Sequence, residues 1–144
     1  MLKHVVCPHC TSTNRFPEDK LEAELNCGKC HESLFKQLPT AVSDVQLENH
    51  ISKNEIPVVV DFWAPWCGPC KMMAPEFEKA CAVIEPYARF VKVDTEANQS
   101  VGMRHNIRSI PTLAIFNKGK EIARLSGARS ASDIAQWVRS NLKS

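Results

Sequence analysis

Cysteine spacing is the feature of this 144-residue sequence that points most directly to chemistry. Six of the seven cysteines form three C-x-x-C pairs, namely Cys7 with Cys10, Cys27 with Cys30, and Cys67 with Cys70. Two thiols at this spacing can bind a soft metal ion or exchange electrons with a disulfide. A complete disulfide framework would leave one thiol, Cys81, unpaired. We therefore expect metal binding or redox chemistry in a reducing compartment.

The third pair is placed for redox chemistry. It follows an apolar, β-branched run at residues 56–63, which predicts a strand buried on both faces, and it opens a helix predicted over residues 67–84. The free N–H groups and the dipole at a helix N-terminus stabilise a thiolate, so the pKa of Cys67 should be lowered. This thiolate would attack a disulfide, and Cys70 would resolve the mixed disulfide. Pro69 suits a helix start because it lacks an N–H group.

Several features of this segment have alternative interpretations. The pair Cys67 and Cys70 also fits a structural or metal-binding site, although no second pair lies nearby in sequence. We expect Trp66 on an exposed docking surface and Trp63 packed beside the active-site loop, with burial of both in the core as the alternative. Cys81 is expected to be a buried spare thiol rather than a regulatory cysteine.

The first two pairs match the spacing of a structural zinc site. Sixteen residues separate Cys10 from Cys27, as in the pattern C-x2-C-x15–20-C-x2-C. Four thiolates complete a tetrahedral shell around zinc and leave no open position for catalysis. So short a segment has too small a core to fold without the metal. The alternatives are that His9 or His31 is a ligand, or that residues 7–10 (CPHC) are redox-active. That segment lacks a preceding buried strand and a following helix pattern.

The residues around the third pair resemble a known family. Residues 63–71 (WAPWCGPCK) are similar to the active-site motif of the thioredoxin family, and the resemblance runs from about Thr40 to the C-terminus. The resemblance implies catalytic roles for Cys67, Cys70, Asp61 and Lys92. It implies substrate binding by Trp63, Trp66, Gly68, Pro69, Ile110, Pro111 and Gly127. The N-terminal run resembles the zinc-bearing segment of the bacterial thioredoxin 2 group, so the resemblance covers almost the whole chain.

Two of these positions also have a physical interpretation of their own. Asp61 lies in an apolar strand, so burial should raise its pKa and suit it to carry the proton of Cys70. The alternative is a carboxylate that only pairs with Lys92. Pro111 in a cis peptide would let the backbone of Ile110 pair with an extended substrate segment, and an ordinary turn proline is the alternative. The sequence leaves the isomer open.

The rest of the pattern predicts an α/β fold. Ser43 should cap a helix that directs Val45, Leu47 and Ile51 to the core and ends near Asn54. Further strands are predicted at residues 89–94, 112–116 and 121–125, and further helices at residues 99–105 and 130–141. This order implies a central mixed β-sheet flanked by helices, which is the thioredoxin fold.

The small N-terminal zinc-ribbon module precedes that fold. Pro39 disfavours helix at the residue before it, so we place the join there. Residues 1–38 are expected to form the zinc-binding module, and residues 39–144 the thioredoxin domain.

Charge and hydropathy exclude several classes of partner. The formal net charge of +2 is too small to predict nucleic acid or an anionic membrane as a partner. No apolar run approaches the roughly 20 residues that a membrane helix needs, and no export signal is apparent. We expect a cytoplasmic monomer.

Together these features predict a thiol–disulfide oxidoreductase that reduces disulfides in client proteins. The resemblance implies thioredoxin reductase, drawing on NADPH, as the partner that restores the dithiol. Zinc is the only expected cofactor, with a structural role and a further role in sensing oxidation. The alternatives are an oxidant or isomerase that uses the same pair, and a zinc-ribbon interaction module joined to a redox-dead domain.

Overall fold

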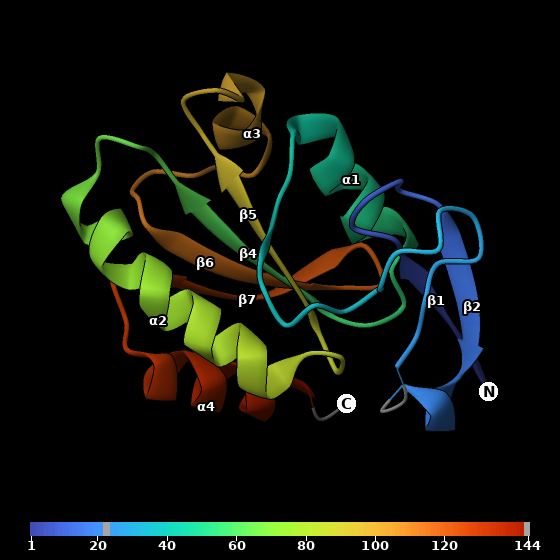
Figure 1. Cartoon of the computed structure of the whole chain (residues 1–144). Coiled ribbons are helices and arrows are strands. Elements are labelled where there is room, and N and C mark those ends of the chain that lie inside the picture. Colours follow the sequence, from blue (N-terminus) through green and yellow to red (C-terminus); the bar gives the residue numbers. More distant parts are fainter. Residues whose placement is uncertain (22–23, 143–144) are drawn as a thin grey trace.

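The computed structural model describes residues 1–21 and 24–142, so residues 143–144 of the expected thioredoxin domain lie outside the described part. Two sheets make up the molecule, a two-stranded hairpin near the N-terminus and a five-stranded sheet (Figure 1). The hairpin consists of β1 (Leu2–Val6) and β2 (Thr13–Pro17), followed by the short 3-10 helix η1 (Glu18–Lys20). The strands of the large sheet are β3 (Thr40–Ala41), β4 (Val58–Trp63), β5 (Arg89–Asp94), β6 (Thr112–Asn117) and β7 (Lys120–Ser126). The helices are α1 (Asp44–Lys53), α2 (Gly68–Ile84), α3 (Gln99–Arg104) and α4 (Ala131–Leu142).

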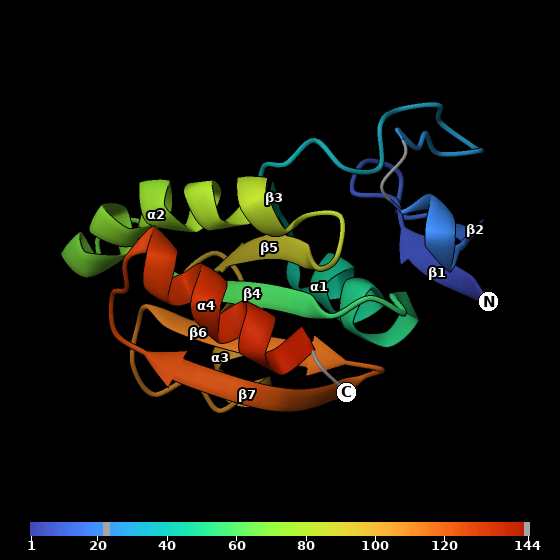
Figure 2. The same cartoon turned by 90° about the horizontal axis from the view of Figure 1, so that it is seen from below.

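The large sheet is mixed, with strand order β3-β5-β4-β6-β7. Strands β3, β5 and β4 are parallel, whereas β6 and β7 are antiparallel to their neighbours. Helices α2 and α4 lie together on one face, and α1 and α3 lie on the other (Figures 1 and 2). This arrangement confirms the predicted mixed sheet with helices on both faces. It also explains the apolar run of β4, which is covered on both sides.

Two apolar clusters fill the space between these layers. Phe77 of α2 and Ile134 of α4 pack with Phe90 of β5 in the first cluster. Leu47 of α1 packs with Val91 in the second, on the opposite face of the sheet. The central strands are therefore fixed from both sides, and their carboxyl ends supply a rigid base for the loop that follows β4.

Helix α1 begins as predicted, but the prediction that Val45 is directed to the core is wrong. Ser43 forms a capping box with Gln46, and Leu47 and Ile51 are buried. Val45 is 75% exposed. Two residues correspond to about 200° around a helix, so Val45 cannot share a face with Leu47.

Three strands were not predicted. Strands β1 and β2 lie in the cysteine-rich segment, where the sequence shows no sustained apolar period, and they pair only with each other. Strand β3 has two residues, and its pairing with Val91 and Lys92 of β5 defines it. Such strands depend on partners that are distant in sequence, which a local pattern does not reveal.

The N-terminal module rests on the end of the sheet opposite the start of α2 (Figure 2). Arg89, which is 1% exposed, holds the two parts together. Its guanidinium donates hydrogen bonds to the carbonyl oxygens of Leu34 (2.7 Å) and Val6 (3.3 Å) and lies 4.4 Å from the Phe35 ring centroid. Glu85 forms an ion pair with it at 3.4 Å. The buried charge of Arg89 is thus balanced by one carboxylate and two backbone carbonyls of the module.

The described helices include none that is both long and apolar enough to cross a membrane.

Candidate active site and candidate zinc site

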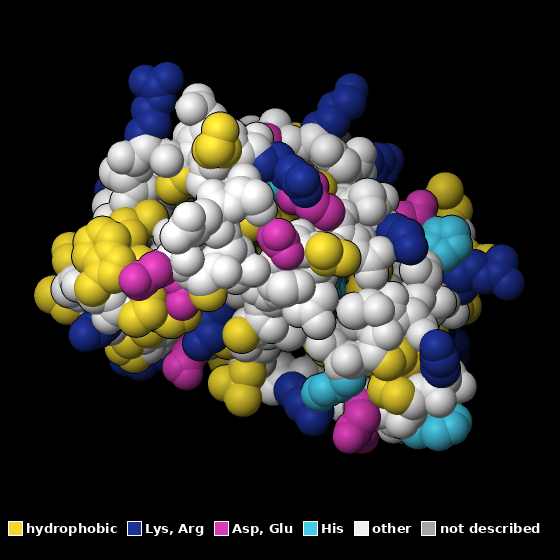
Figure 3. Space-filling model, turned by 90° about the horizontal axis from the view of Figure 1, so that it is seen from above, with side chains coloured by type: hydrophobic (Ala, Val, Ile, Leu, Met, Phe, Trp, Pro, Cys, Tyr) yellow, Lys and Arg dark blue, Asp and Glu magenta, His cyan; other side chains and the backbone are white. Residues whose placement is uncertain are grey.

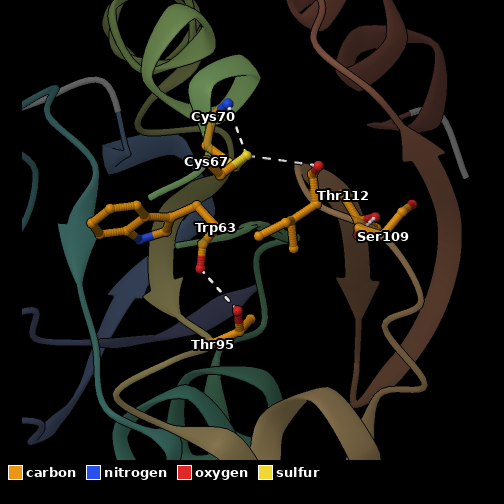
Figure 4. Close-up of a disulfide and its surroundings, with 7 residues drawn as sticks. Trp63, Cys67, Cys70, Thr95, Ser109 and Thr112 are labelled. Atoms are coloured by element: carbon orange, nitrogen blue, oxygen red, sulfur yellow. Dashed lines mark hydrogen bonds between the residues drawn. A yellow bond between two sulfur atoms is a disulfide. The ribbon is translucent and has the colours of Figure 1, made fainter. Parts of the chain in front are cut away.

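The Cys67–Cys70 pair occupies the first turn of α2. Cys67 is the N-cap of the helix, and its Sγ accepts a hydrogen bond from the backbone N–H of Cys70 at 3.2 Å (Figure 4). A disulfide joins the two residues, whose Cα atoms lie 5.2 Å apart. Pro69 falls within the first two helical positions, where its missing N–H removes no hydrogen bond. The helix terminus therefore provides the N–H donor and the dipole that stabilise a thiolate on Cys67 once the disulfide is opened.

A loop before β6 approaches the disulfide from the other side. Cys67 Sγ lies 3.8 Å from the carbonyl oxygen of Ile110, and the Ile110–Pro111 peptide is cis. Thr112 Oγ1 donates to the Ser109 carbonyl at 2.6 Å and so closes this loop (Figure 4). The N–H of Gly127 donates to the Pro111 carbonyl at 2.9 Å.

Gly127 has a φ of +90°, which only glycine adopts without strain. The structure thus brings the Ile110 carbonyl to the sulfur of Cys67, and Gly127 contacts the same loop through the Pro111 carbonyl. The Ile110–Pro111 peptide is cis, which decides the choice of isomer that the sequence left open.

Asp61 and Lys92 lie side by side on neighbouring strands, β4 and β5, as Cα partners in the register. The Asp61 carboxyl group is buried, and burial raises its pKa to about 7, while the positive charge of Lys92 opposes that rise. Asp61 Oδ1 accepts no hydrogen bond from any described residue, Lys92 included. The direction of this pKa shift is the one expected from burial, and the role of Asp61 towards Cys70 stays a prediction.

A cavity of about 140 Å³ lies beside Asp61, and its lining includes Trp63, Lys71, Glu78 and Lys92. The indole N–H of Trp63 is buried and has no hydrogen-bond partner among the described residues. Both residues, Asp61 and Trp63, line one small cavity, which is wide enough for water.

Exposed apolar surface surrounds the redox pair. Trp66 is 69% exposed, and hydrophobic side chains gather at the end of the molecule where α2 begins (Figure 3). A hollow of about 260 Å³ runs from Trp66 past Ile110, with Thr95 and Arg108 in its lining. The predicted exposure of Trp66 is confirmed. Trp63 is only partly buried and packs beside Cys67 and Cys70, as expected.

Two residues of this region were missed in the sequence. Thr95 holds the Trp63 carbonyl with both its backbone N–H (2.8 Å) and its Oγ1 (3.1 Å) (Figure 4). Arg108 contributes the charged part of the hollow. The available signal was position, because Thr95 directly follows β5 and Arg108 stands two residues before Ile110.

The other four paired cysteines converge in the N-terminal module. One sulfur atom from each of Cys7, Cys10, Cys27 and Cys30 lies within 4.8 Å of the other three. Sulfur–sulfur contacts of 3.6 Å join Cys7 with Cys30 and Cys10 with Cys27. The set matches the predicted ligands, and it has the composition and the compactness of a tetrahedral zinc site.

Two turns of the same shape present these sulfurs. In each turn the N–H of the first cysteine donates to a carbonyl five residues ahead, at 2.9 Å for Cys7 and 2.8 Å for Cys27. A residue with left-handed backbone ends each turn, Thr11 (φ 65°) in one and His31 (φ 68°) in the other. Neither turn continues into a helix. The two turns therefore present their sulfurs as ligands. Their cysteines do not lie at the N-terminus of a helix, as Cys67 does.

Hydrogen bonds to sulfur favour thiolates in this cluster. The N–H groups of His9 and Lys29 each point to the first cysteine of their turn, Cys7 and Cys27, at 3.4 Å. Hydrogen bonding, chiefly by the Cys30 backbone, lowers the pKa of Cys27 to about 5, whereas burial raises the pKa of Cys7 to about 12. Thiolates are the form in which cysteine binds zinc, so the donor set fits the metal.

Asn14 also contributes to this cluster, although the cysteine spacing predicts no role for it. Its Nδ2 donates to Cys27 Sγ at 3.6 Å, and its Oδ1 accepts from the Gly28 N–H at 2.9 Å. The imidazoles of His9 and His31, the alternative ligands, are exposed and lie outside the sulfur cluster. Asn14 thus ties the two turns together.

Cys81 is buried on α2, as predicted for a spare thiol. Burial and then the neighbouring Glu85 carboxylate raise its pKa far above the usual range. A thiol in this environment is a poor nucleophile.

Comparison with known proteins agrees with both sites. The family model "Thioredoxin" matches residues 38–140, and the model "Thioredoxin 2, N-terminal", a zinc ribbon, matches residues 6–32. Thioredoxin C-3 of Corynebacterium nephridii is 45% identical over 139 residues, which are 96% of this chain and 95% of that protein. Thioredoxin 1 of Synechococcus elongatus is 40% identical over 71% of this chain and 95% of its own length.

Solved structures show the same relationship. A mutant thioredoxin from Halobacterium salinarum superposes with a TM-score of 0.68 at 27% identity, covering 76% of this chain and 96% of that one. The thioredoxin of Malassezia sympodialis gives a TM-score of 0.64 at 32% identity, covering 71% and 89%. The family implies reductase and disulfide-containing client partners in general. The chain thus belongs to the thioredoxin family and is a protein-disulfide reductase with an N-terminal zinc ribbon of the thioredoxin 2 type.

Proposed function

We propose that Cys67 is the nucleophile and Cys70 the resolving thiol in the reduction of client proteins. The Cys67 thiolate attacks one sulfur of a client disulfide, so that a mixed disulfide forms and one client thiolate leaves. Cys70 then attacks Cys67 Sγ, which releases the second client thiolate and forms the Cys67–Cys70 disulfide. Two electrons pass to the client. The observation that carries this proposal is the N-cap position of Cys67, with the Cys70 N–H directed at its sulfur.

Asp61 and Lys92 are proposed to manage the proton of Cys70. Cys70 must lose a proton before it attacks, and a carboxyl group with a pKa of about 7 is matched to that task near neutral pH. Lys92, the strand neighbour of Asp61, keeps that pKa from rising further. The cavity beside Asp61 supplies the connection to water.

The residues around the disulfide are proposed to bind the client. Trp66 supplies exposed apolar contact. Ile110 and Pro111 present backbone beside Cys67, and Gly127 holds that loop through the Pro111 carbonyl. Trp63, Gly68 and Pro69 complete the surface around the sulfurs. An extended client segment is the substrate that suits exposed backbone next to a nucleophile.

The cycle requires a source of electrons, which we propose is an NADPH-dependent thioredoxin reductase. We propose that the protein is located in the cytoplasm, because five of its cysteines form no disulfide and a reducing compartment preserves such thiols. We also propose that it is a monomer. Residues 1–38 act as the zinc module and residues 39–144 as the thioredoxin domain. Neither nucleic acid nor membrane is a partner in this proposal.

The test is NADPH consumption with thioredoxin reductase and a disulfide-containing protein. The native chain should turn over, Cys67→Ser should not, and Cys81→Ser, the matched control outside the site, should behave as the native chain does. If the folded native chain fails to turn over but oxidises a reduced protein, the oxidant or isomerase interpretation replaces this one.

For the N-terminal module we propose a structural zinc ion bound by Cys7, Cys10, Cys27 and Cys30. Bound zinc would supply the folding free energy that so small a core lacks. We further propose that the module senses oxidation, because Cys10 and Cys30 are partly exposed. In a titration with hydrogen peroxide, zinc should leave and turnover with a client protein should change. Zinc that stays bound, or that leaves without effect on turnover, would contradict the sensing role.

A further inference from the structure

The four sulfurs of the zinc module can pair in three ways once they are oxidised. We propose that peroxide converts them into two disulfides that cross between the turns, Cys7 with Cys30 and Cys10 with Cys27. The inference rests on the sensing role proposed above and specifies its chemistry. The two disulfides would replace the metal as the links between the turns.

Burial argues against the first alternative pairing. Cys7 and Cys27 are buried, whereas Cys10 and Cys30 are partly exposed. Peroxide reaches an exposed sulfur first, and the pairing needs a second thiolate to attack the oxidised sulfur. Joining Cys7 with Cys27 would require peroxide to reach a fully buried sulfur. The crossed pairing gives each disulfide one exposed and one buried member, and so does pairing within each turn.

The scaffold that holds the two turns face to face favours the crossed pairing over pairing within each turn, and the crossed sulfurs are already in contact. Both crossed contacts are 3.6 Å, and a disulfide needs a sulfur separation of about 2.05 Å. Small side-chain rotations close that gap if the two turns stay face to face.

Several contacts hold the turns in this position. Strand β1 directly precedes the first turn, strand β2 follows it, and the two strands pair with each other. Asn26 forms a β-bridge with Ser33 across the second turn. Asn14 binds Gly28 and Cys27 of the second turn from a position beside the first. Arg89 binds the carbonyls of Val6 and Leu34, one next to each turn. Apart from the hydrogen bond to Cys27 Sγ, these contacts do not involve the sulfurs, so they hold the turns face to face during the reaction, although they do not keep a reduced, metal-free module folded.

One peroxide molecule oxidises each pair of sulfurs. One thiolate attacks a peroxide oxygen and becomes a sulfenic acid as the O–O bond breaks, and the departing hydroxide takes a proton to give water. The second thiolate then attacks the sulfenic sulfur, the S–O bond breaks, and another water forms. Two sulfurs lose two electrons, and one peroxide gains them. The whole ribbon consumes two peroxides and four protons and releases one zinc ion.

The pairing determines what happens to the module afterwards. Crossed disulfides link residue 7 to residue 30 and residue 10 to residue 27, so they constrain the unfolded chain as zinc would. The module would then stay folded and stay bound to Arg89 without metal. Disulfides within each turn would leave the two turns unconnected.

The experiment uses the full chain with the Cys67–Cys70 disulfide already formed and with Cys81→Ser, so that only four thiols remain. Peroxide is added, zinc release is followed with a chromogenic chelator, and non-reducing tryptic peptides are mapped by mass spectrometry. Trypsin separates residues 4–15, 21–29 and 30–36. Crossed disulfides join all three peptides, and fragmentation between Cys7 and Cys10 assigns each link. A matched sample is reduced and stripped of zinc by a chelator. Limited proteolysis should cleave it within the module, whereas the peroxide-treated chain should resist.

Each outcome has a separate meaning. Peptide 4–15 with an internal disulfide, and residues 21–29 joined only to 30–36, would overturn the crossed pairing while zinc release left the sensing role standing. Crossed links without any change in client turnover would support the pairing and contradict sensing. Retained zinc with four free thiols would overturn both.

Discussion

The molecule contains the same tetrapeptide spacing in two kinds of surroundings. At Cys67 and Cys70 the chain leaves a buried strand and continues into a helix of 17 residues. At the two N-terminal pairs a residue with left-handed backbone, Thr11 or His31, stops the turn instead. The helix gives Cys67 aligned N–H groups beside an exposed docking surface, whereas the turns direct four sulfurs at one another. The backbone after a C-x-x-C pair therefore decides between disulfide exchange and metal binding.

The two regions also differ in how they are stabilised. The thioredoxin domain has apolar clusters on both faces of its sheet. The ribbon has small clusters around Val5 and Leu34, and it borrows Ile56 and Arg89 from the domain. A core of this size is not sufficient alone, so the ribbon depends on thiolate chemistry and on docking.

Replacing one cysteine by serine in each region should separate disulfide reduction from zinc binding completely. Cys67→Ser should abolish reduction of a small disulfide reagent and leave zinc content unchanged, because the nucleophile is lost and the ribbon is distant. Cys27→Ser should lose zinc but still reduce that reagent, because the start of α2, which carries Cys67 and Cys70, is at the other end of the molecule. Zinc analysis and a colorimetric thiol assay measure both. Loss of both properties in either variant would show that the regions are not independent.

Removing the charge between the regions should cost the most stability. Arg89→Met leaves Glu85 buried without its cation, and breaking such a pair costs about 3–5 kcal/mol. Urea unfolding of the zinc-loaded chain measures the loss. The double variant Glu85→Gln with Arg89→Met should lose less than the single one, since no unpaired charge remains. Equal losses would mean that packing, not charge, is the cause.

Asp61→Asn should change both stability and turnover with pH. The folded pKa of about 7 lies above the ordinary aspartate value, so the native state holds the proton more tightly than the unfolded state does. The stability that this provides is complete below about pH 4 and is lost as pH rises to about 7. Asp61→Asn should therefore be more stable than the native chain at pH 8, by at most about 4 kcal/mol, and the gap should close at pH 4.

The turnover rate of Asp61→Asn at pH 8 should fall, whereas its stability should rise. Without a proton acceptor for Cys70, turnover of Asp61→Asn at pH 8 should fall about a hundredfold and lose its dependence on pH near 7. Unfolding and turnover measured across pH 4–9 check both statements. Equal stability of the two chains at pH 8 would contradict the buried, high-pKa carboxyl group.

A smaller effect is expected from Asn14→Ala in the ribbon. The variant removes the amide that donates to Cys27 Sγ and binds the Gly28 N–H. Loss of an outer contact of this kind lowers metal affinity about 10–100-fold. Competition with a zinc chelator measures it, and turnover of a small disulfide reagent should stay unchanged. Unchanged zinc affinity would mean that the turns are held by the strands alone.

The smallest effect is expected at the docking surface. Trp66→Ala should raise KM for a protein client about tenfold, because a large exposed contact is lost. The kcat should change little, since Cys67 keeps its N-cap geometry. Steady-state kinetics separates the two, and Met103→Ala, which removes another exposed apolar side chain, on α3, is the matched control. A fall in kcat with constant KM would assign Trp66 to the chemistry.

Sequence by itself determined the local parts of this protein. Strand β4, helix α2 and the cysteines at its start follow from apolar runs, a proline and a two-residue spacing, which act over a few neighbouring residues. The four zinc-site cysteines were predictable for the same reason, because their pattern is a spacing. The capping box at Ser43 and the buried carboxyl group of Asp61 also belong here.

Only the tertiary structure decided how these parts meet. Arg89 stands in an ordinary strand pattern, yet its guanidinium binds carbonyls 55 and 83 residues away. Strand β3, the loop of Ile110 beside Cys67, and the crossed sulfur contacts of the ribbon likewise depend on partners distant in sequence. The free energy of these contacts arises only when the chain has folded, because burial and long-range pairing create it. A pattern read along the chain can therefore identify the reactive residues, but it cannot show which of them will touch.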